Sequence, residues 1–291
     1  MAVINVQGLT YTYPGSTSPA LKDINFQIES GQLVAVIGGN EAGKSTLCLA
    51  LSGLIPALFH GQMQGMVTVC GMDTQQYSPG QFAGQVGLVL QNPANQLSGM
   101  RYTVYEEVAF GLENLGISRV EMPARIENAL EQVGLAELCD RSPYALSGGQ
   151  QQRLALASVL ALTPSVLLLD EPTAMLDPQG SQDVFEIIQK LVQAGTTVVI
   201  AEHHLEWIAR YADRIIALAH GEVILDGSPR EVLTSSRIQE AGINWLRYTQ
   251  AAHLGIARGL WSPNTELPIT LEQTLAGFRQ MGTTSSTRQE T

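Results

Sequence analysis

The sequence predicts an α/β fold in which a parallel β-sheet carries a phosphate-binding loop. One observation is a set of short, continuous apolar runs, which are typical of parallel strands buried on both faces. A second is that segments with apolar residues at helical spacing separate these runs, as in strand–helix–strand units. A third is a pair of glycine-rich loops, at 38–45 and 146–150, each followed by a helical pattern. Together they predict a nucleotide-binding core with a helical insertion.

Each predicted strand is an alternating or an apolar segment of the sequence. Residues 1 to about 30 alternate apolar and polar side chains around a Pro14-Gly15 turn, which predicts a subdomain of antiparallel strands. Short apolar runs predict five further strands, and the buried runs among them are expected to form the parallel sheet. These runs span 33–37, 67–71, 86–90, 166–169 and 197–201.

A helical insertion interrupts this core. The pattern is helical from 103 to 162, and it begins with Thr103 and Glu106, which form a candidate capping box. We therefore expect a helical insertion at about 92–163, inside a nucleotide-binding domain that spans 1–233.

Beyond that domain the chain changes character. Ser228, followed by proline and then by an acid at 231, predicts the start of a helix that closes the domain. Residues 234–281 are expected to form a small helical appendage, because a second capping pattern at Thr270 precedes apolar residues at helical spacing. These apolar residues are Leu271, Leu275 and Phe278. The polar residues 282–291 are expected to be disordered.

The composition is that of a globular protein, with 45% hydrophobic residues among 291. The net charge of −11 and the lack of a basic run argue against nucleic acid as the main partner. The three cysteines are widely spaced, which predicts buried thiols in a reducing cytoplasm and neither a metal site nor a disulfide framework. No secretory signal starts the sequence, and the longest apolar stretch, 154–169, is too short to span a bilayer. We expect a chain that is soluble by itself and peripheral in any membrane role.

The first glycine-rich loop, Gly-Gly-Asn-Glu-Ala-Gly-Lys-Ser at 38–45, is called the phosphate loop below. It fits the pattern G-x-x-x-x-G-K-[ST] between a strand and a helix, where backbone N–H groups and the helix start attract phosphates. Lys44 can reach the outer phosphates, and Ser45 can ligate Mg²⁺. Glu41 is expected to point to solvent, because an inward carboxylate would repel the phosphates. Nucleotide contacts are expected from Gly38, Asn40, Gly43, Lys44, Ser45 and the following Thr46.

Two acids end the 166–169 strand. Because the chain begins to turn at a strand end, Asp170 and Glu171 can both face one site. Asp170 suits a Mg²⁺ contact through water, and Glu171 suits a general base that polarises the attacking water. A pair of solvated acids at a strand end would show the same pattern.

The second glycine-rich loop is Leu-Ser-Gly-Gly-Gln at 146–150, which is called the signature loop below. Ser147 and Gln150 fit a capping box, and a glycine-rich helix start is a second anion site. An ordinary glycine turn before a helix would also have this sequence.

In this order and context, these segments resemble the ATP-binding-cassette (ABC) ATPases from about residue 3 to 233. The phosphate loop matches the family's Walker A motif, 146–150 its signature motif and 166–171 its Walker B strand. Through the same resemblance, four single residues gain expected roles. They are Gln91 of the Q-loop, Asp177 of the D-loop, the switch histidine His203 and Tyr13, which would stack on adenine. Tyr11 is the alternative for the adenine contact. His203 follows Glu202, at a position where the family more commonly has Thr.

The resemblance implies an ATPase of the ABC type that works as a head-to-tail dimer with an identical or related chain. Its cofactors would be ATP and Mg²⁺. Catalysis is expected from Glu171, His203 and Gln91, and Mg²⁺ binding from Ser45, Gln91 and Asp170. The phosphate loop of one chain and the signature loop of the other would hold each ATP, since an insertion that projects away from the core separates the two loops of one chain. The residues expected to act on the partner's ATP are Ser147, Gly149, Gln150 and Asp177.

The segment 91–97, Gln-Asn-Pro-Ala-Asn-Gln-Leu, resembles the Q-helix of energy-coupling-factor transporters, which supply vitamins and transition-metal ions to prokaryotes. The segment 108–114 and the C-terminal appendage fit the same subgroup. In that subgroup a membrane scaffold docks on the ATPases, and a separate small membrane protein binds the substrate. The resemblance implies a peripheral protein at the cytoplasmic face of the membrane, with the scaffold docking near Gln91, Pro93, Asn95 and Gln96.

Other functions share parts of this pattern. An ATPase subunit of another ABC transporter class would carry every motif outside 91–97. A soluble cassette ATPase that acts on nucleic acid or in cluster assembly would carry them too, although the acidic charge disfavours nucleic acid. A P-loop kinase for a small molecule would carry the phosphate loop but not the signature loop.

Overall fold

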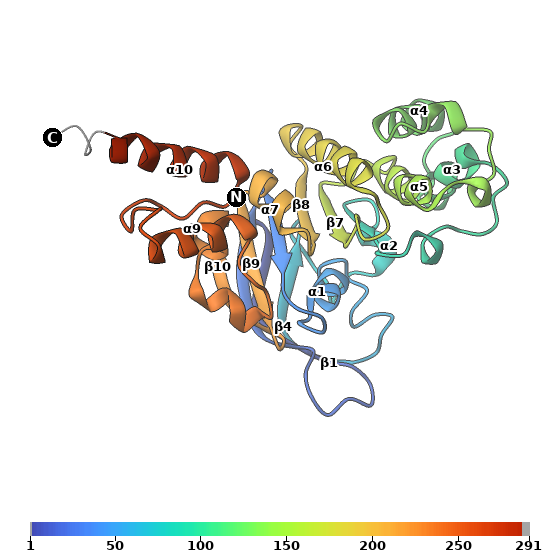
Figure 1. Cartoon of the computed structure of the whole chain (residues 1–291). Coiled ribbons are helices and arrows are strands. Elements are labelled where there is room, and N and C mark those ends of the chain that lie inside the picture. Colours follow the sequence, from blue (N-terminus) through green and yellow to red (C-terminus); the bar gives the residue numbers. More distant parts are fainter. Residues whose placement is uncertain (1, 287–291) are drawn as a thin grey trace.

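The computed structural model describes residues 2–286 (Figure 1). Within these residues, the centre is a six-stranded sheet in the order β10-β9-β3-β8-β7-β6. Its strands are parallel except for β10 (Glu222–Gly227), which pairs antiparallel with β9. The parallel strands are β3 (Leu33–Ile37), β6 (Val86–Val89), β7 (Val166–Asp170), β8 (Thr197–Ala201) and β9 (Arg214–Ala219). Every residue of β3, β7 and β8 is buried, which explains their nearly continuous apolar sequences.

A second, antiparallel sheet confirms the strands expected near the N-terminus. Its order is β2-β1-β4-β5. Its strands are β1 (Ala2–Thr12), β2 (Leu21–Glu29), β4 (Gln62–Val69) and β5 (Met72–Asp73). Apolar side chains from β1 and β2 share a core cluster with residues of β3 and β7 and with Leu47, Ala50 and Leu51 of α1 (Lys44–Leu51). Helix α1 therefore lies in the core that joins the two sheets.

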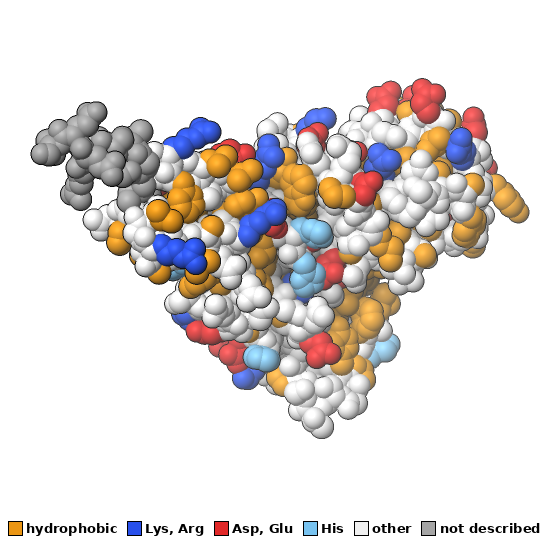
Figure 2. Space-filling model, in the orientation of Figure 1, with side chains coloured by type: hydrophobic (Ala, Val, Ile, Leu, Met, Phe, Trp, Pro, Cys, Tyr) orange, Lys and Arg blue, Asp and Glu red, His pale blue; other side chains and the backbone are white. Residues whose placement is uncertain are grey.

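The helical insertion follows β6 and forms one end of the molecule, at the upper right of Figure 1. Thr103 and Glu106 make the predicted capping box at the start of α3. Figure 2 shows acidic side chains gathered at the outer end of this insertion. The insertion contains η1 (Pro93–Asn95), α3 (Val104–Asn114), α4 (Met122–Gln132), η2 (Ala136–Leu138), η3 (Pro143–Ala145) and α5 (Gly148–Leu160), whereas the short α2 (Pro79–Phe82) precedes β6.

Three more helices belong to the core. They are α6 (Pro178–Gln193), α7 (Leu205–Tyr211) and α8 (Pro229–Leu233). Ser228 and Glu231 form the predicted capping box of α8. None of the helices in residues 2–286 is long and apolar enough to cross a membrane.

The C-terminal appendage is helical, as predicted, and contains η4 (Ser236–Ala241), α9 (Arg247–Ala257) and α10 (Leu271–Ser286). The prediction of disorder from residue 282 was wrong for 282–286, which continue α10, because extending an existing helix gains one hydrogen bond for each residue fixed. Residues 287–291 lie outside the described part of the chain. The predicted apolar stripe of α10 is only partly buried. Phe278 packs edge-on against Trp261, whereas Leu271 and Leu275 are about half exposed.

The appendage also contacts the phosphate loop. A second core cluster packs against the six-stranded sheet and includes residues of β3, β7, β8 and β9. Ala241, at the end of η4, is buried in this cluster, and its carbonyl oxygen accepts a 2.8 Å hydrogen bond from the N–H of Gly39. Ile238 and Leu246 belong to the same core cluster. Residues on both sides of position 233 therefore share one core.

Candidate functional site

The phosphate loop turns between β3 and α1 and lines a cavity of about 440 Å³. Lys44 is only 5% exposed, and its Nζ donates 3.1 Å hydrogen bonds to the carbonyl oxygens of Gly38 and Gly39. Gly43 has a φ of +105°, and a Cβ there would lie 2.8 Å from the Ala20 carbonyl oxygen, so the turn requires glycine. Glu41 is exposed, and it also lines this cavity.

Tyr13 lies beside this loop, and its hydroxyl is 3.1 Å from the Thr46 hydroxyl. It is half-buried, with Tyr11 and Phe59 edge-on to its ring. Tyr11 is completely buried in the core between the sheets, so the alternative assignment of the adenine contact to Tyr11 was wrong. Its side chain belongs to the alternating pattern of β1 and points inward.

We expect Tyr13→Ala to weaken ATP binding by about 1–3 kcal/mol, the usual contribution of one aromatic stacked on a base. A fluorescent ATP analogue titrated into the protein measures the change. Tyr102→Ala serves as the matched control, because Tyr102 is 85% exposed on the helical insertion. Unchanged affinity in Tyr13→Ala would move the adenine contact to the neighbouring Phe59.

The acids at the end of β7 lie against α1. Asp170 Oδ1 accepts a 3.1 Å hydrogen bond from the Ser45 hydroxyl. Burial raises the pKa of Asp170 above its ordinary value, and the bond from Ser45 partly offsets this effect. A hydroxyl and a carboxylate so close together are the oxygen ligands that Mg²⁺ prefers, and Gln91 lines the same cavity as Ser45. The residues present therefore fit a magnesium ion.

Glu171 is the centre of the site, and its side chain is 14% exposed. Its Oε1 lies 2.6 Å from His203 Nε2 and 3.7 Å from Lys44 Nζ. Its Oε2 accepts a 2.7 Å hydrogen bond from Gln91 Nε2. The backbone has a φ of +49°, a left-handed conformation that is uncommon for this residue type. The structure thus brings two of the predicted catalytic residues, Gln91 and His203, to the carboxylate of the third, Glu171, and it places His203 rather than His204 there.

The signature loop forms a separate site. Ser147 and Gln150 make the predicted capping box, with bonds of 2.9 and 3.3 Å. Asp177 caps α6 through a 2.7 Å bond from the Gly180 N–H. Ser147, Gly149, Gln150 and Asp177 all line a second cavity of about 440 Å³, which shares no lining residue with the phosphate-loop cavity. The predicted nucleotide contacts therefore fall into two halves that do not meet within one chain.

The predicted docking segment is only partly available to a partner. Asn95 is exposed, whereas Pro93 is buried. Gln96 is half-buried, and its side chain is bonded to the protein: its Oε1 accepts a 2.9 Å bond from the Leu90 N–H, and its Nε2 donates to the Ala155 carbonyl oxygen at 3.3 Å. Gln96 therefore ties the end of β6 to α5.

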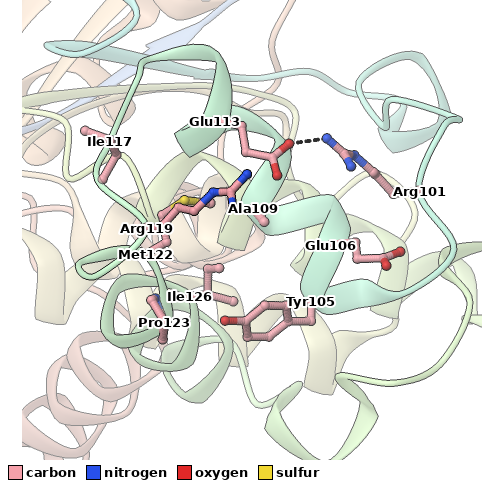
Figure 3. Close-up of a pocket in the computed structure, with 10 residues that line it drawn as sticks. All are labelled: Arg101, Tyr105, Glu106, Ala109, Glu113, Ile117, Arg119, Met122, Pro123 and Ile126. Atoms are coloured by element: carbon pink, nitrogen blue, oxygen red, sulfur yellow. Dashed lines mark hydrogen bonds and ion pairs between the residues drawn. The ribbon is translucent and has the colours of Figure 1, made fainter.

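A larger pocket, of about 720 Å³, lies between α3 and α4 (Figure 3). Its walls combine apolar side chains with charged ones, including the ion pair of Arg101 and Glu113. No sequence motif indicates this pocket, because its lining is spread over α3, α4 and the loops before each of them. The lining residues are Arg101, Tyr105, Glu106, Ala109, Glu113, Ile117, Arg119, Met122, Pro123 and Ile126.

Comparisons with known proteins agree with this geometry. The profile of the ABC transporter family matches residues 21–174. A putative ABC transporter ATP-binding protein of Pyrococcus abyssi is 42% identical over 82% of this chain and 85% of its own length. The energy-coupling factor transporter ATP-binding protein EcfA1 of Levilactobacillus brevis is 39% identical over 99% of this chain and 93% of its own length.

Solved structures show the same similarity. The structure of cbiO1 from Clostridium perfringens, described as part of the ABC transporter complex cbiONQ, is 33% identical with a TM-score of 0.72. The match covers 88% of this chain and 96% of cbiO1. A dimeric ATP-binding cassette in a post-hydrolysis state with ADP and phosphate is 29% identical with a TM-score of 0.69, over 78% of this chain and 99% of that one.

Proposed function

Because the chain belongs to the ABC transporter family, as an ATP-binding cassette that hydrolyses ATP, we propose that it is the ATPase subunit of an energy-coupling-factor importer. The solute would be a vitamin or a transition-metal ion. The observation that carries this proposal is the similarity to EcfA1, which extends over 99% of the chain, appendage included. The segment 91–97 supports it.

The site suits hydrolysis of ATP shared between two chains. One chain would hold the phosphates with Lys44 and the N–H groups of its phosphate loop, and the partner's signature loop would close over them. Mg²⁺, bound by Ser45, Asp170 and Gln91, would neutralise charge on the outer phosphates. Glu171 would accept the proton of the attacking water. Loss of the γ-phosphate would remove contacts with the opposing helix start, so that hydrolysis separates the two chains.

The transporter class is tested by purification. The tagged chain, extracted with detergent from membranes of its host, is expected to carry a scaffold protein and a small substrate-binding membrane protein with it, at the cytoplasmic face. Mass spectrometry identifies both. Recovery with permease subunits that lack a separate small membrane protein would support another ABC transporter class, and recovery without any membrane protein would support a soluble cassette ATPase.

We propose further that the scaffold contacts the exposed side of 91–98 and the pocket between α3 and α4. Two features support the site: Asn95 is exposed, and Arg101, three residues after this segment, lines the pocket. The apolar floor of the pocket suits a short amphipathic helix, whose polar side could meet the charged rim. Gln96 would transmit movement, because it connects β6 to α5.

Asn95→Arg is expected to weaken co-purification with the scaffold about tenfold or more, since an unpaired charge buried in an interface costs about 1.4 kcal/mol or more. Solute uptake should fall, while ATP hydrolysis by the isolated chain stays unchanged. Asn128→Arg is the control, because Asn128 is exposed on α4 and does not line the pocket. Equal effects of the two variants would place the docking surface elsewhere.

A further inference from the structure

Glu202 is an acid buried at the end of β8, with an exposed fraction of 1%. A carboxylate in such a place is costly unless both oxygens are hydrogen-bonded. Here both are. Oε1 accepts bonds from the backbone N–H groups of His203, at 2.7 Å, and His204, at 3.2 Å. Oε2 accepts a 2.6 Å bond from the Thr173 hydroxyl.

These donors belong to the two loops that carry the reacting groups. Thr173 lies two residues after Glu171 in the loop that follows β7, and His203 follows β8. The two strands are parallel neighbours, with Asp170 opposite Ala201. One residue after Asp170, the N–H of Glu171 donates a 2.9 Å hydrogen bond to the Ala201 carbonyl oxygen. Glu202 thus bridges the loops at the point where the side chains of Glu171 and His203 meet.

We propose that Glu202 is a positioning residue for ATP hydrolysis: its carboxylate fixes His203 and Glu171 relative to one another. This inference rests on the proposed roles of those two residues. Its geometric basis is that one buried side chain accepts bonds from both loops. A misplacement of about 1 Å can reduce a rate about a hundredfold. The relative position of the Glu171 and His203 side chains therefore matters for the rate of the chemical step.

The same geometry predicts which kinetic constant depends on Glu202. Its side-chain hydrogen bonds reach the two strand-end loops and none of them reaches the phosphate loop. Its backbone N–H donates to the Val36 carbonyl oxygen in β3, a contact that Glu202→Leu and Glu202→Gln both retain. ATP binding should therefore survive the loss of the carboxylate, and turnover should not.

Glu202→Leu removes the acceptor at nearly constant volume. We expect its kcat for ATP hydrolysis to fall about 10- to 100-fold, with a KM for ATP within about twofold of the wild type. ATP-induced dimerisation, followed by size-exclusion chromatography, should remain. Glu202→Gln keeps one oxygen for the two N–H groups and an amide that can donate to the Thr173 hydroxyl, so it should retain most of the activity.

Thr173→Val supplies an independent test that does not place an apolar side chain at position 202. It removes only the hydroxyl that reaches Glu202, so kcat should fall by a smaller factor at unchanged KM. Combined with Glu202→Leu, it should cost little beyond the Glu202→Leu loss, since both changes break the same bridge. Glu206→Leu is the matched control, because Glu206 is an exposed acid on α7 that faces Arg247 at 3.5 Å.

Three results would overturn the role of Glu202. They are wild-type kcat in both Glu202→Leu and Thr173→Val, a rise in KM without a fall in kcat, and a loss in Glu202→Gln as large as in Glu202→Leu. His203→Ala separates this inference from the proposed site. Wild-type turnover in His203→Ala would overturn the assignment of the catalytic site itself. Loss of turnover in His203→Ala together with full turnover in Glu202→Leu would overturn only the positioning role of Glu202.

Discussion

Glu171→Gln is expected to bind ATP but to hydrolyse it about 10²–10⁴-fold more slowly, the usual contribution of a general base. The amide keeps the shape of the carboxylate and can still accept a hydrogen bond from Gln91 or from His203, so the fold should persist. An amide cannot accept the proton of the attacking water. The variant should therefore accumulate as an ATP-bound dimer.

Phosphate release and size-exclusion chromatography with ATP measure both parts of this expectation. Glu186→Gln is a suitable control, because Glu186 is exposed on α6 and its carboxylate accepts a bond from Gln182. Phosphate release near the wild-type rate in Glu171→Gln would show that another group is the base. Loss of ATP binding would show instead that the carboxylate supports the phosphate loop through Lys44, which lies 3.7 Å away.

Ser147→Arg should abolish hydrolysis although it leaves the phosphate loop of its own chain intact. Ser147 opens α5 and lines the cavity of the signature loop, which is separate from the cavity around Lys44. A long cation there would fill the space that the partner's ATP needs. In a homodimer of this variant both shared sites are blocked.

Mixing Ser147→Arg with Lys44→Ala tests whether the sites are shared. Lys44→Ala alone should be inactive, because the phosphates lose their fixed cation. A mixed dimer has one intact site and one doubly broken site, so random pairing should restore about a quarter of the wild-type activity if the sites act independently. Full activity of Ser147→Arg by itself would exclude a shared site, whereas a mixture that stays inactive although the chains exchange would show that one intact site is not enough for hydrolysis.

The sequence predicted the parts of the site that depend on local pattern. The pattern G-x-x-x-x-G-K-[ST] between a strand and a helix has a characteristic geometry, and acids at the end of a parallel strand lie at the edge of the sheet where that loop lies, so the positions of the phosphate loop and Glu171 could be predicted. The antiparallel strands near the N-terminus followed from alternation, and the starts of α3, α5, α8 and α10 followed from capping residues. The strands end at a common edge of the sheet, which is why Gln91 and His203 reach one carboxylate.

Contacts between distant segments could not be predicted. The bond between Gln96 and Ala155 joins residues 59 positions apart, and no pattern near Gln96 indicates whether its side chain points inward. The bond between Thr173 and Glu202 spans 29 positions, although an acid where the family more often has Thr was a signal of a local difference. Leu271 and Leu275 are half exposed although their helical spacing predicted a packed face. Helical spacing identifies the apolar face of a helix but does not say which residues cover it.

The hydrogen bond from Gly39 to Ala241 changes what the boundary at residue 233 means. A shortened protein ending there would keep every nucleotide motif, yet it would expose core side chains beneath Ile238 and Ala241 and leave an amide of the phosphate loop without its acceptor. The sequence boundary is therefore a change of pattern inside one packed core, and we expect a cut there to destabilise the phosphate loop.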